Sequence, residues 1–126
     1  MIVAFTFPQS AEYTIISPPE DPVISIRDYA VMTADKFSVD KEKFARLIAC
    51  ESEWKEDALG DNETSFGILQ FKKSTFEMFI KKYGLTDLNI DNPYHQIDLA
   101  TRMIKNGYGF HWKNCMRRLR WVLVHN

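Results

Sequence analysis

Glu51 is an acidic residue at the end of an apolar pattern that is typical of a helix. Phe44, Leu47 and Ile48 precede it at spacings that place their side chains and the Glu51 carboxyl on one helical face. A carboxylate on such a face loses hydration, which favours its protonated form and raises its pKa. The pattern therefore indicates a side chain suited to proton donation. The alternative is that the helix ends near Ser52 and that the Glu51 side chain turns out to water.

A polar segment and then a second apolar segment follow Glu51. Residues 55–64 are mostly polar and include Gly60 and the pair Asp61-Asn62, which favour turns over helices. We expect a loop or a short hairpin there that returns the chain over the end of the Glu51 helix. The next segment, 65–70, reads SFGILQ. In it, Gly67 lets the backbone approach a neighbour closely, and Gln70 offers an amide donor and acceptor to a polar ligand.

The order of these segments resembles the signature of the soluble lytic transglycosylases, a family of the lysozyme-like superfamily. Its members carry a Glu-Ser pair, a loop and then Gly-Leu-Met-Gln, and this chain carries Glu51-Ser52, a loop and Gly67-Ile68-Leu69-Gln70. Asn92-Pro93 through Gln96-Ile97 likewise resembles the Asn-Pro and Asn-Ile element of the family. The resemblance implies a mainly α, lysozyme-like helical domain of the α+β class. A short loop or β-hairpin would separate the catalytic helix from the GILQ segment.

Two positions depart from the family pattern. Members usually have an Ala-Tyr-Asn-Ala-Gly motif whose tyrosine borders the active site, whereas residues 106–112 read NGYGFHW. Tyr108 is the candidate for the place of that tyrosine. Gly60 lies near the position where many members have a serine that contacts the substrate, and Ser65 is the candidate substitute.

The resemblance implies cleavage of the β-1,4 link between N-acetylmuramic acid and N-acetylglucosamine by one glutamate. Glu51 would protonate the leaving oxygen, while the acetamido group of the substrate stabilises the oxocarbenium-like carbon. The same side chain would then take the proton of the C6 hydroxyl, which closes a 1,6-anhydro ring. The scheme needs no metal and no cofactor. The residues expected to hold the substrate or shape its groove are Ser65, Gln70, Trp54, Phe66 and Tyr108.

Two other functions remain open on the same fold. A hydrolase similar to goose-type lysozyme needs a second carboxylate to activate water, and its candidates are Asp57, Asp61 and Glu63. A non-catalytic glycan-binding or assembly module would use the scaffold without Glu51 chemistry.

The two cysteines lie on either side of the segment that contains Glu51 and the GILQ motif. Cys50 directly precedes Glu51, and Cys115 follows Trp112. In an exported wall enzyme, such a pair is expected to form one disulfide; the alternative is two buried free thiols. The three histidines and two cysteines show no spacing typical of a metal site.

Composition limits the partners and the place of action. The chain has 126 residues with 45% hydrophobic residues, which suits one compact domain, and we expect a monomer. Its 16 basic and 17 acidic residues give no electrostatic footprint for nucleic acid. No apolar run approaches the roughly 20 residues of a membrane-spanning helix. The resemblance to the transglycosylases implies action on the peptidoglycan glycan strand in the cell envelope, periplasmic or extracellular, although no export signal is evident. Whether the chain serves its host, a phage or a secretion assembly stays open.

The sequence divides into three parts. Residues 1–22 are expected to be an N-terminal arm or linker, because the segment 17–22, SPPEDP, cannot continue a helix. Residues 23–115 would form the lysozyme-like domain. Residues 116–126 would be a C-terminal tail with three arginines followed by WVLV. This tail would either contact an anionic wall polymer or membrane surface, or pack on the domain as a last element.

Hydrophobic periodicity and capping residues predict four helices before that tail. Aspartate at one start and Asn-Pro at another are strong N-terminal signals, and a capping box of Ser74 with Glu77 indicates a third start. The predicted helices run from Ile24 to Phe37, from Asp40 to Ser52, from Ser74 to Gly84 and from Asn92 to Gly107.

Overall fold

The computed structural model describes residues 23–122. The N-terminal arm expected for residues 1–22 and the end of the tail, 123–126, lie outside the described residues. The described part is mainly helical with one small sheet. In chain order the elements are α2 (Ile26–Lys36), α3 (Lys41–Ser52), β1 (Leu59–Gly60), β2 (Ser65–Phe66), β3 (Phe71–Lys72), α4 (Lys73–Lys82), α5 (Pro93–Lys105), the 3-10 helix η2 (Gly109–Trp112) and α6 (Lys113–Arg118).

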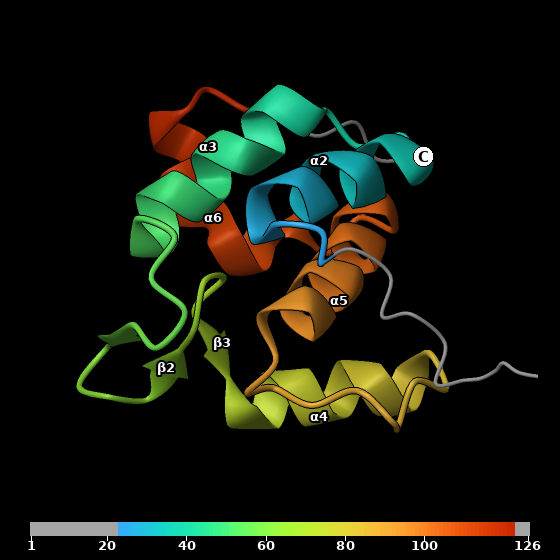
Figure 1. Ribbon diagram of the computed structural model, residues 1–126. Coiled ribbons are helices and arrows are strands. Elements are labelled where there is room, and N and C mark those ends of the chain that lie inside the picture. The colour runs from blue at the N-terminus through green and yellow to red at the C-terminus, as the bar shows by residue number, and fades with distance from the viewer. Residues whose placement is uncertain (1–22, 123–126) are drawn as a thin grey trace, which may run out of the picture.

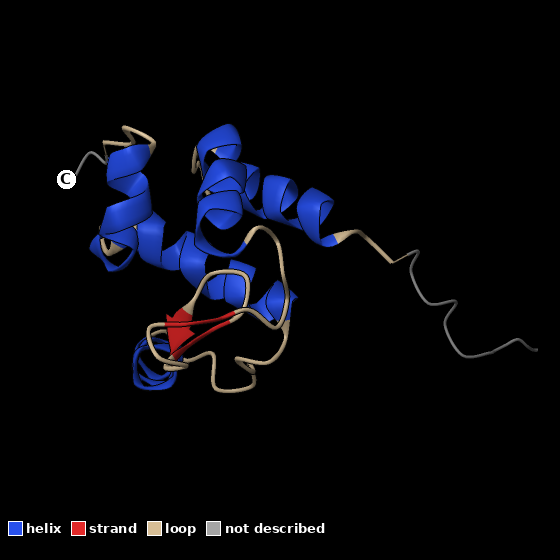
Figure 2. Ribbon diagram, turned by 90° about the vertical axis from the view of Figure 1, so that its left-hand side faces the viewer, coloured by secondary structure: helices blue, strands red, loops and turns tan. Residues whose placement is uncertain are grey.

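The elements form two lobes joined by α5. In Figures 1 and 2, α2 and α3 lie at one end of the molecule, the sheet and α4 lie at the other end, and α5 runs between them. Helix α2 contacts both α3 and α5, while α4 contacts α5 and β3. The chain passes from the α3 lobe to the sheet directly after Glu51, so this residue stands at the junction of the two lobes.

The core lies around α5 and the inward face of α3. Phe44, Leu47 and Ile48 on α3 are fully buried, as the apolar stripe before Glu51 predicts. Ile97 and Ala100 of α5 are also fully buried. The mainly helical fold expected from the sequence is confirmed.

Two helix starts agree with their capping signals. The Asp40 carboxylate accepts a hydrogen bond from the Lys43 amide at 3.0 Å, and the Asn92 side chain accepts one from the Tyr94 amide at 2.9 Å. Pro93 is the first residue of α5. Each side chain satisfies an amide that the first helical turn leaves without a backbone partner.

The predicted start of α4 is wrong. The helix begins at Lys73 rather than Ser74, its N-cap is Lys72, and among the described residues no side chain caps it. The reason is the strand that directly precedes the helix. Lys72 pairs with Ser65 in the sheet, and this pairing fixes where the extended backbone ends and the helix begins.

The expected loop or hairpin is a three-stranded antiparallel sheet in the order β1-β2-β3. The turn between β1 and β2 includes three consecutive residues with left-handed backbone, Asp61, Asn62 and Glu63, at φ 49, 58 and 68°. Aspartate and asparagine tolerate this conformation better than most residues. The sheet brings Asp61, Ser65 and Lys72, from three successive parts of the chain, to one place.

Helix α6 crosses the boundary expected after Cys115. Met116 and Trp121 are buried in the core, and therefore the first part of the expected tail packs on the domain. Among residues 23–122, no helix has both the length and the apolar character needed to span a bilayer.

Candidate active site

A cleft of about 390 Å³ contains the Glu51 side chain. Its lining comes from the last turn of α3, the sheet, the start of α4, and the segment formed by η2 and α6. A volume in this range accommodates a small ligand or part of a chain ligand. The cleft also includes Gln70, so the two halves of the sequence motif meet at one site.

Glu51 is half-buried in this cleft, and its pKa is raised from 4.5 to about 7. Burial is the main cause, because it removes water from the charged form. The negative charge of Asp61 raises the pKa further, whereas the positive charge of Arg118 lowers it. A carboxyl with this pKa exists in both protonation states near neutral pH, so it can donate a proton and later accept one.

Ser52 ends the helix that carries Glu51. Its hydroxyl donates to the Ile48 carbonyl at 3.2 Å and accepts from the Trp54 amide at 3.1 Å. Glu53 and Trp54 then adopt left-handed backbone, with φ 55 and 65°. The chain therefore leaves α3 in a tight turn, and the serine of the Glu-Ser pair fixes that turn.

A disulfide joins Cys50 to Cys115, whose Cα atoms lie 5.9 Å apart. Both residues line the cleft, so the crosslink holds α6 against the residue that precedes Glu51. Arg118 lies one turn further along α6, and its Nη1 is 4.0 Å from the Cys50 sulfur. The crosslink thus positions the cation that opposes the rise in the Glu51 pKa.

Gln70 lines the cleft with its amide already engaged. Its Nε2 donates to the carbonyls of Ala58 and Gly67, at 3.0 and 2.9 Å. Its Oε1 lies against Gly60, where a Cβ atom would overlap it. This contact leaves no room for a side chain at position 60, because the two hydrogen bonds keep the Gln70 amide from moving aside.

The close approach expected at Gly67 is to Gln96, a residue of the family-like element 92–97 for which no contact with the GILQ segment was predicted. A Cβ on Gly67 would overlap the buried Gln96 amide, and Gly67 has φ 87°. The Gln96 Oε1 accepts from the Leu69 amide at 2.9 Å, and its Nε2 donates to the carbonyls of Phe66 and Ile90. Its signal in the sequence was a polar residue on the inward face of an apolar helix.

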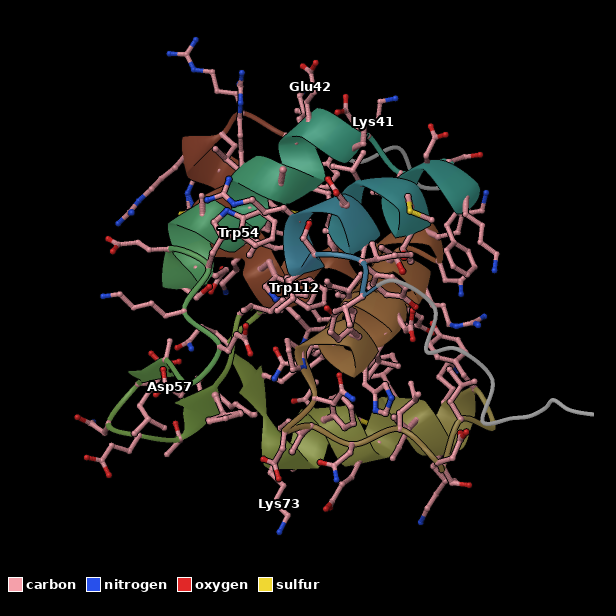
Figure 3. The ribbon with its side chains drawn as sticks, viewed as in Figure 1. Lys41, Glu42, Trp54, Asp57, Lys73 and Trp112 are labelled. Carbon is pink, nitrogen blue, oxygen red and sulfur yellow. A yellow bond between two sulfur atoms is a disulfide. The ribbon has the colours of Figure 1, made fainter. Side chains whose placement is uncertain are left out.

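Asp61 forms a polar cluster with Ser65 and Lys72 at the side of the cleft. Its Oδ2 accepts from the Ser65 hydroxyl at 2.9 Å and from the Lys72 ammonium at 3.2 Å. The hydrogen bond from Ser65, followed by the hydrogen bond and charge of Lys72, lowers the pKa of Asp61. All three candidate second acids are exposed, but only Asp61 lines the cleft, whereas Asp57 and Glu63 lie outside its lining. Figure 3 shows Asp57 on the outer loop beside the sheet.

The three aromatic candidates lie outside the cleft lining, and their contact with substrate stays a prediction. Trp54 packs under the Arg27 guanidinium, 4.7 Å from the ring centroid. Phe66 belongs to β2, and Tyr108 packs on Phe79 with the ring centroids 4.9 Å apart.

The aromatic side chains that line the cleft come instead from η2 and β3. They are Phe71, Phe110, His111 and Trp112. None of the four was expected to contact substrate. The signal in the sequence that could have identified them is the aromatic run 110–112 shortly after Tyr108. Among the described residues, no cluster of three or more histidines, cysteines or acidic residues could hold a metal ion.

The mainly helical fold and the cleft around a half-buried glutamate define a lysozyme-like domain. A model of the transglycosylase SLT domain family matches residues 28–118, which include Glu51, the GILQ segment and α5. The chain therefore belongs to the transglycosylase SLT domain family. Comparisons with curated proteins and with solved structures gave no match. Family membership supports a peptidoglycan-related, lytic transglycosylase-like function at the cell wall.

Proposed function

We propose that the domain is a lytic transglycosylase that cleaves the MurNAc-GlcNAc β-1,4 link with Glu51 as its single acid and base. The observation that carries this proposal is the half-buried Glu51 carboxyl, with a pKa of about 7, in a cleft lined mostly by polar side chains. Membership of the SLT family supplies the substrate class.

In the first step, protonated Glu51 donates its proton to the glycosidic oxygen, and the bond from that oxygen to the muramic acid C1 breaks. The acetamido group of the substrate stabilises the positive charge that develops at C1. In the second step, the Glu51 carboxylate accepts the proton of the C6 hydroxyl while O6 bonds to C1. The product is a 1,6-anhydro end, the proton is back on Glu51, and no water is consumed.

The residues around Glu51 are proposed to prepare it for both steps. Burial and the charge of Asp61 favour the protonated form that starts the reaction, and Arg118 favours the carboxylate that finishes it. Ser65 and Gln70 are proposed to contact polar groups of the sugar from the sheet side. The position of both residues in the cleft lining supports this role, and their internal hydrogen bonds hold the two side chains in place before substrate arrives.

The second candidate function is hydrolysis. Because Asp61 lines the cleft, it is a better candidate than Asp57 or Glu63 for the base that activates water. Its partners argue against that role. The Ser65 and Lys72 contacts lower the Asp61 pKa, and a carboxylate with a lowered pKa is a weaker general base. Transglycosylation is therefore the function that this arrangement supports better.

We further propose that the domain acts outside the cytoplasm, in the periplasm or at the cell surface. The Cys50–Cys115 disulfide supports this location, since such bonds persist in oxidising compartments. The peptidoglycan strand is the proposed partner, and a monomeric state stays a prediction.

Digestion of purified peptidoglycan tests the proposed function. Glu51→Gln should lower the rate of fragment release by at least about a hundredfold, because it removes both proton transfers. Glu56→Gln, at an exposed position on the loop after α3, is the matched control and should digest like the wild type. Equal rates for Glu51→Gln and the wild type would refute Glu51 as the acid. A wild type that binds the polymer without digesting it would instead point to a non-catalytic glycan-binding module.

A further inference from the structure

Phe110 is an exposed aromatic residue on the wall of the cleft. Its exposed fraction is 60%, and of the large apolar side chains exposed within residues 23–122, it alone lines the cleft. Its neighbours in the cleft lining are mostly polar or charged, including Lys113 and Asn114. An apolar ring among polar side chains on a cleft wall can supply the apolar contact that small-ligand sites combine with polar groups.

Another aromatic ring packs against one face of the Phe110 ring. His111 stacks on it with centroids 4.4 Å apart and an interplanar angle of 28°. The His111 ring in turn makes a T-shaped contact with the Phe79 ring, with centroids 5.4 Å apart. Partial burial lowers the pKa of His111, which favours the neutral ring in this stack. The Phe110 side chain therefore has a supported face and an open side.

The backbone under Phe110 is fixed as well. Trp112, at the end of η2, is 3% exposed and lies in the middle of the molecule (Figure 3). Its Nε1 donates to the Leu69 carbonyl at 2.8 Å, and its ring meets Phe71 edge to face at 5.5 Å. The disulfide at Cys115 ties the following helix to α3. Little ordering of the Phe110 segment is needed when a ligand binds, which preserves binding free energy.

A pyranose ring matches such a surface. One face of the sugar carries C–H groups and is apolar, whereas its edge carries hydroxyl and acetamido groups that form hydrogen bonds. A planar aromatic side chain buries the apolar face, and nearby polar side chains can meet the edge. Lys113 and Asn114 follow Phe110 closely in the chain and line the same cleft.

We propose that Phe110, supported by His111, is a stacking platform for an N-acetylated sugar ring of the glycan that occupies the Glu51 cleft. This inference rests on the proposed function, which supplies the glycan, and it adds a substrate-contacting residue from η2. The platform positions the strand along the cleft wall, while Glu51 acts on the link between rings. Phe110 is thus a binding residue and has no part in the proton transfers.

The test uses binding without cleavage. In a Glu51→Gln background, the affinity for a tetramer of β-1,4-linked N-acetylglucosamine is measured by isothermal titration calorimetry. Phe110→Ala should weaken binding about tenfold, and Phe110→Leu should weaken it similarly because it has no planar ring. Phe110→Tyr should bind within about twofold of the parent. Met78→Ala is the matched control, since Met78 has a comparable exposed fraction of 56% and lies outside the cleft.

The outcomes separate the platform from the proposed reaction. Equal affinity of the Phe110→Ala variant and its parent, or a parent that does not bind the tetramer, would overturn the platform. Digestion by the wild type is measured independently. If the wild type fails to digest peptidoglycan but tetramer binding depends on Phe110, the proposed reaction fails and the platform stands. Thermal unfolding of each variant checks that the fold is intact, which the exposure of Phe110 leads us to expect.

Discussion

Replacing Glu51 by glutamine should stabilise the fold at pH 8 and leave it unchanged at pH 4. The pKa of Glu51 is about 7 in the folded protein, compared with an ordinary value of 4.5. Between these values the folded state binds more protons than the unfolded state, so stability falls as pH rises through this range. Below pH 4.5 the carboxyl is protonated in both states and has no such effect. Glutamine cannot ionise, so the variant does not lose the folding stability that the wild type loses above pH 7.

The size of the effect follows from the two pKa values. Their difference corresponds to about 3 kcal/mol at pH 8, since each tenfold change in proton affinity is about 1.4 kcal/mol. Because the side chain is only half-buried, solvent screening reduces this to about 1 to 2 kcal/mol. For a domain of this size, the melting temperature should then rise by about 4 °C or more.

Thermal unfolding followed by circular dichroism, with the disulfide kept oxidised, measures the difference at both pH values. Glu56→Gln serves again as the control, and its melting temperature should follow that of the wild type at pH 4 and at pH 8. An equal melting temperature for Glu51→Gln and wild type at pH 8, or a lower one for the variant, would show that burial does not oppose ionisation of Glu51.

Three further predictions concern the neighbours of Glu51. Asp61→Asn should lower the Glu51 pKa, because it removes a negative charge. The alkaline limb of the pH–activity profile should then move to lower pH. A limb that does not move would contradict the electrostatic coupling of Asp61 to Glu51. Cys115→Ser should cost about 4 kcal/mol in urea unfolding, since the disulfide closes a separation of 65 residues; an unchanged midpoint would contradict this. Gly67→Ala should cost at least about 1 kcal/mol, because the Cβ overlaps Gln96 at a left-handed position, and wild-type stability would refute that contact.

Local signals in the sequence predicted the elements that carry Glu51. The apolar spacing of Phe44, Leu47 and Ile48 predicted the buried face of α3, and these residues are fully buried. Asp40 and Asn92 marked helix starts correctly because an N-cap acts on amides only two or three residues away. The capping box at Ser74 failed where a nonlocal interaction, the pairing of Lys72 with Ser65, set the boundary.

The surroundings of Glu51 could not be predicted because they depend on contacts between distant segments. Gln96 holds the GILQ segment from 27 residues away, and Trp112 holds it from 43 residues away. The polarity of Gln96 and the size of Trp112 do not identify the residues that they contact. Phe110 belongs to a short 3-10 helix without hydrophobic periodicity, so its exposure inside the cleft becomes visible only in the folded chain.

The central claim is that Glu51 completes the reaction without water. Digestion of peptidoglycan by the wild type in water enriched with oxygen-18, followed by mass spectrometry of the fragments, tests it most directly. We predict fragments with 1,6-anhydro ends that carry no heavy oxygen at the cleaved link. Fragments with reducing ends that carry oxygen-18 would contradict the account and identify the domain as a hydrolase.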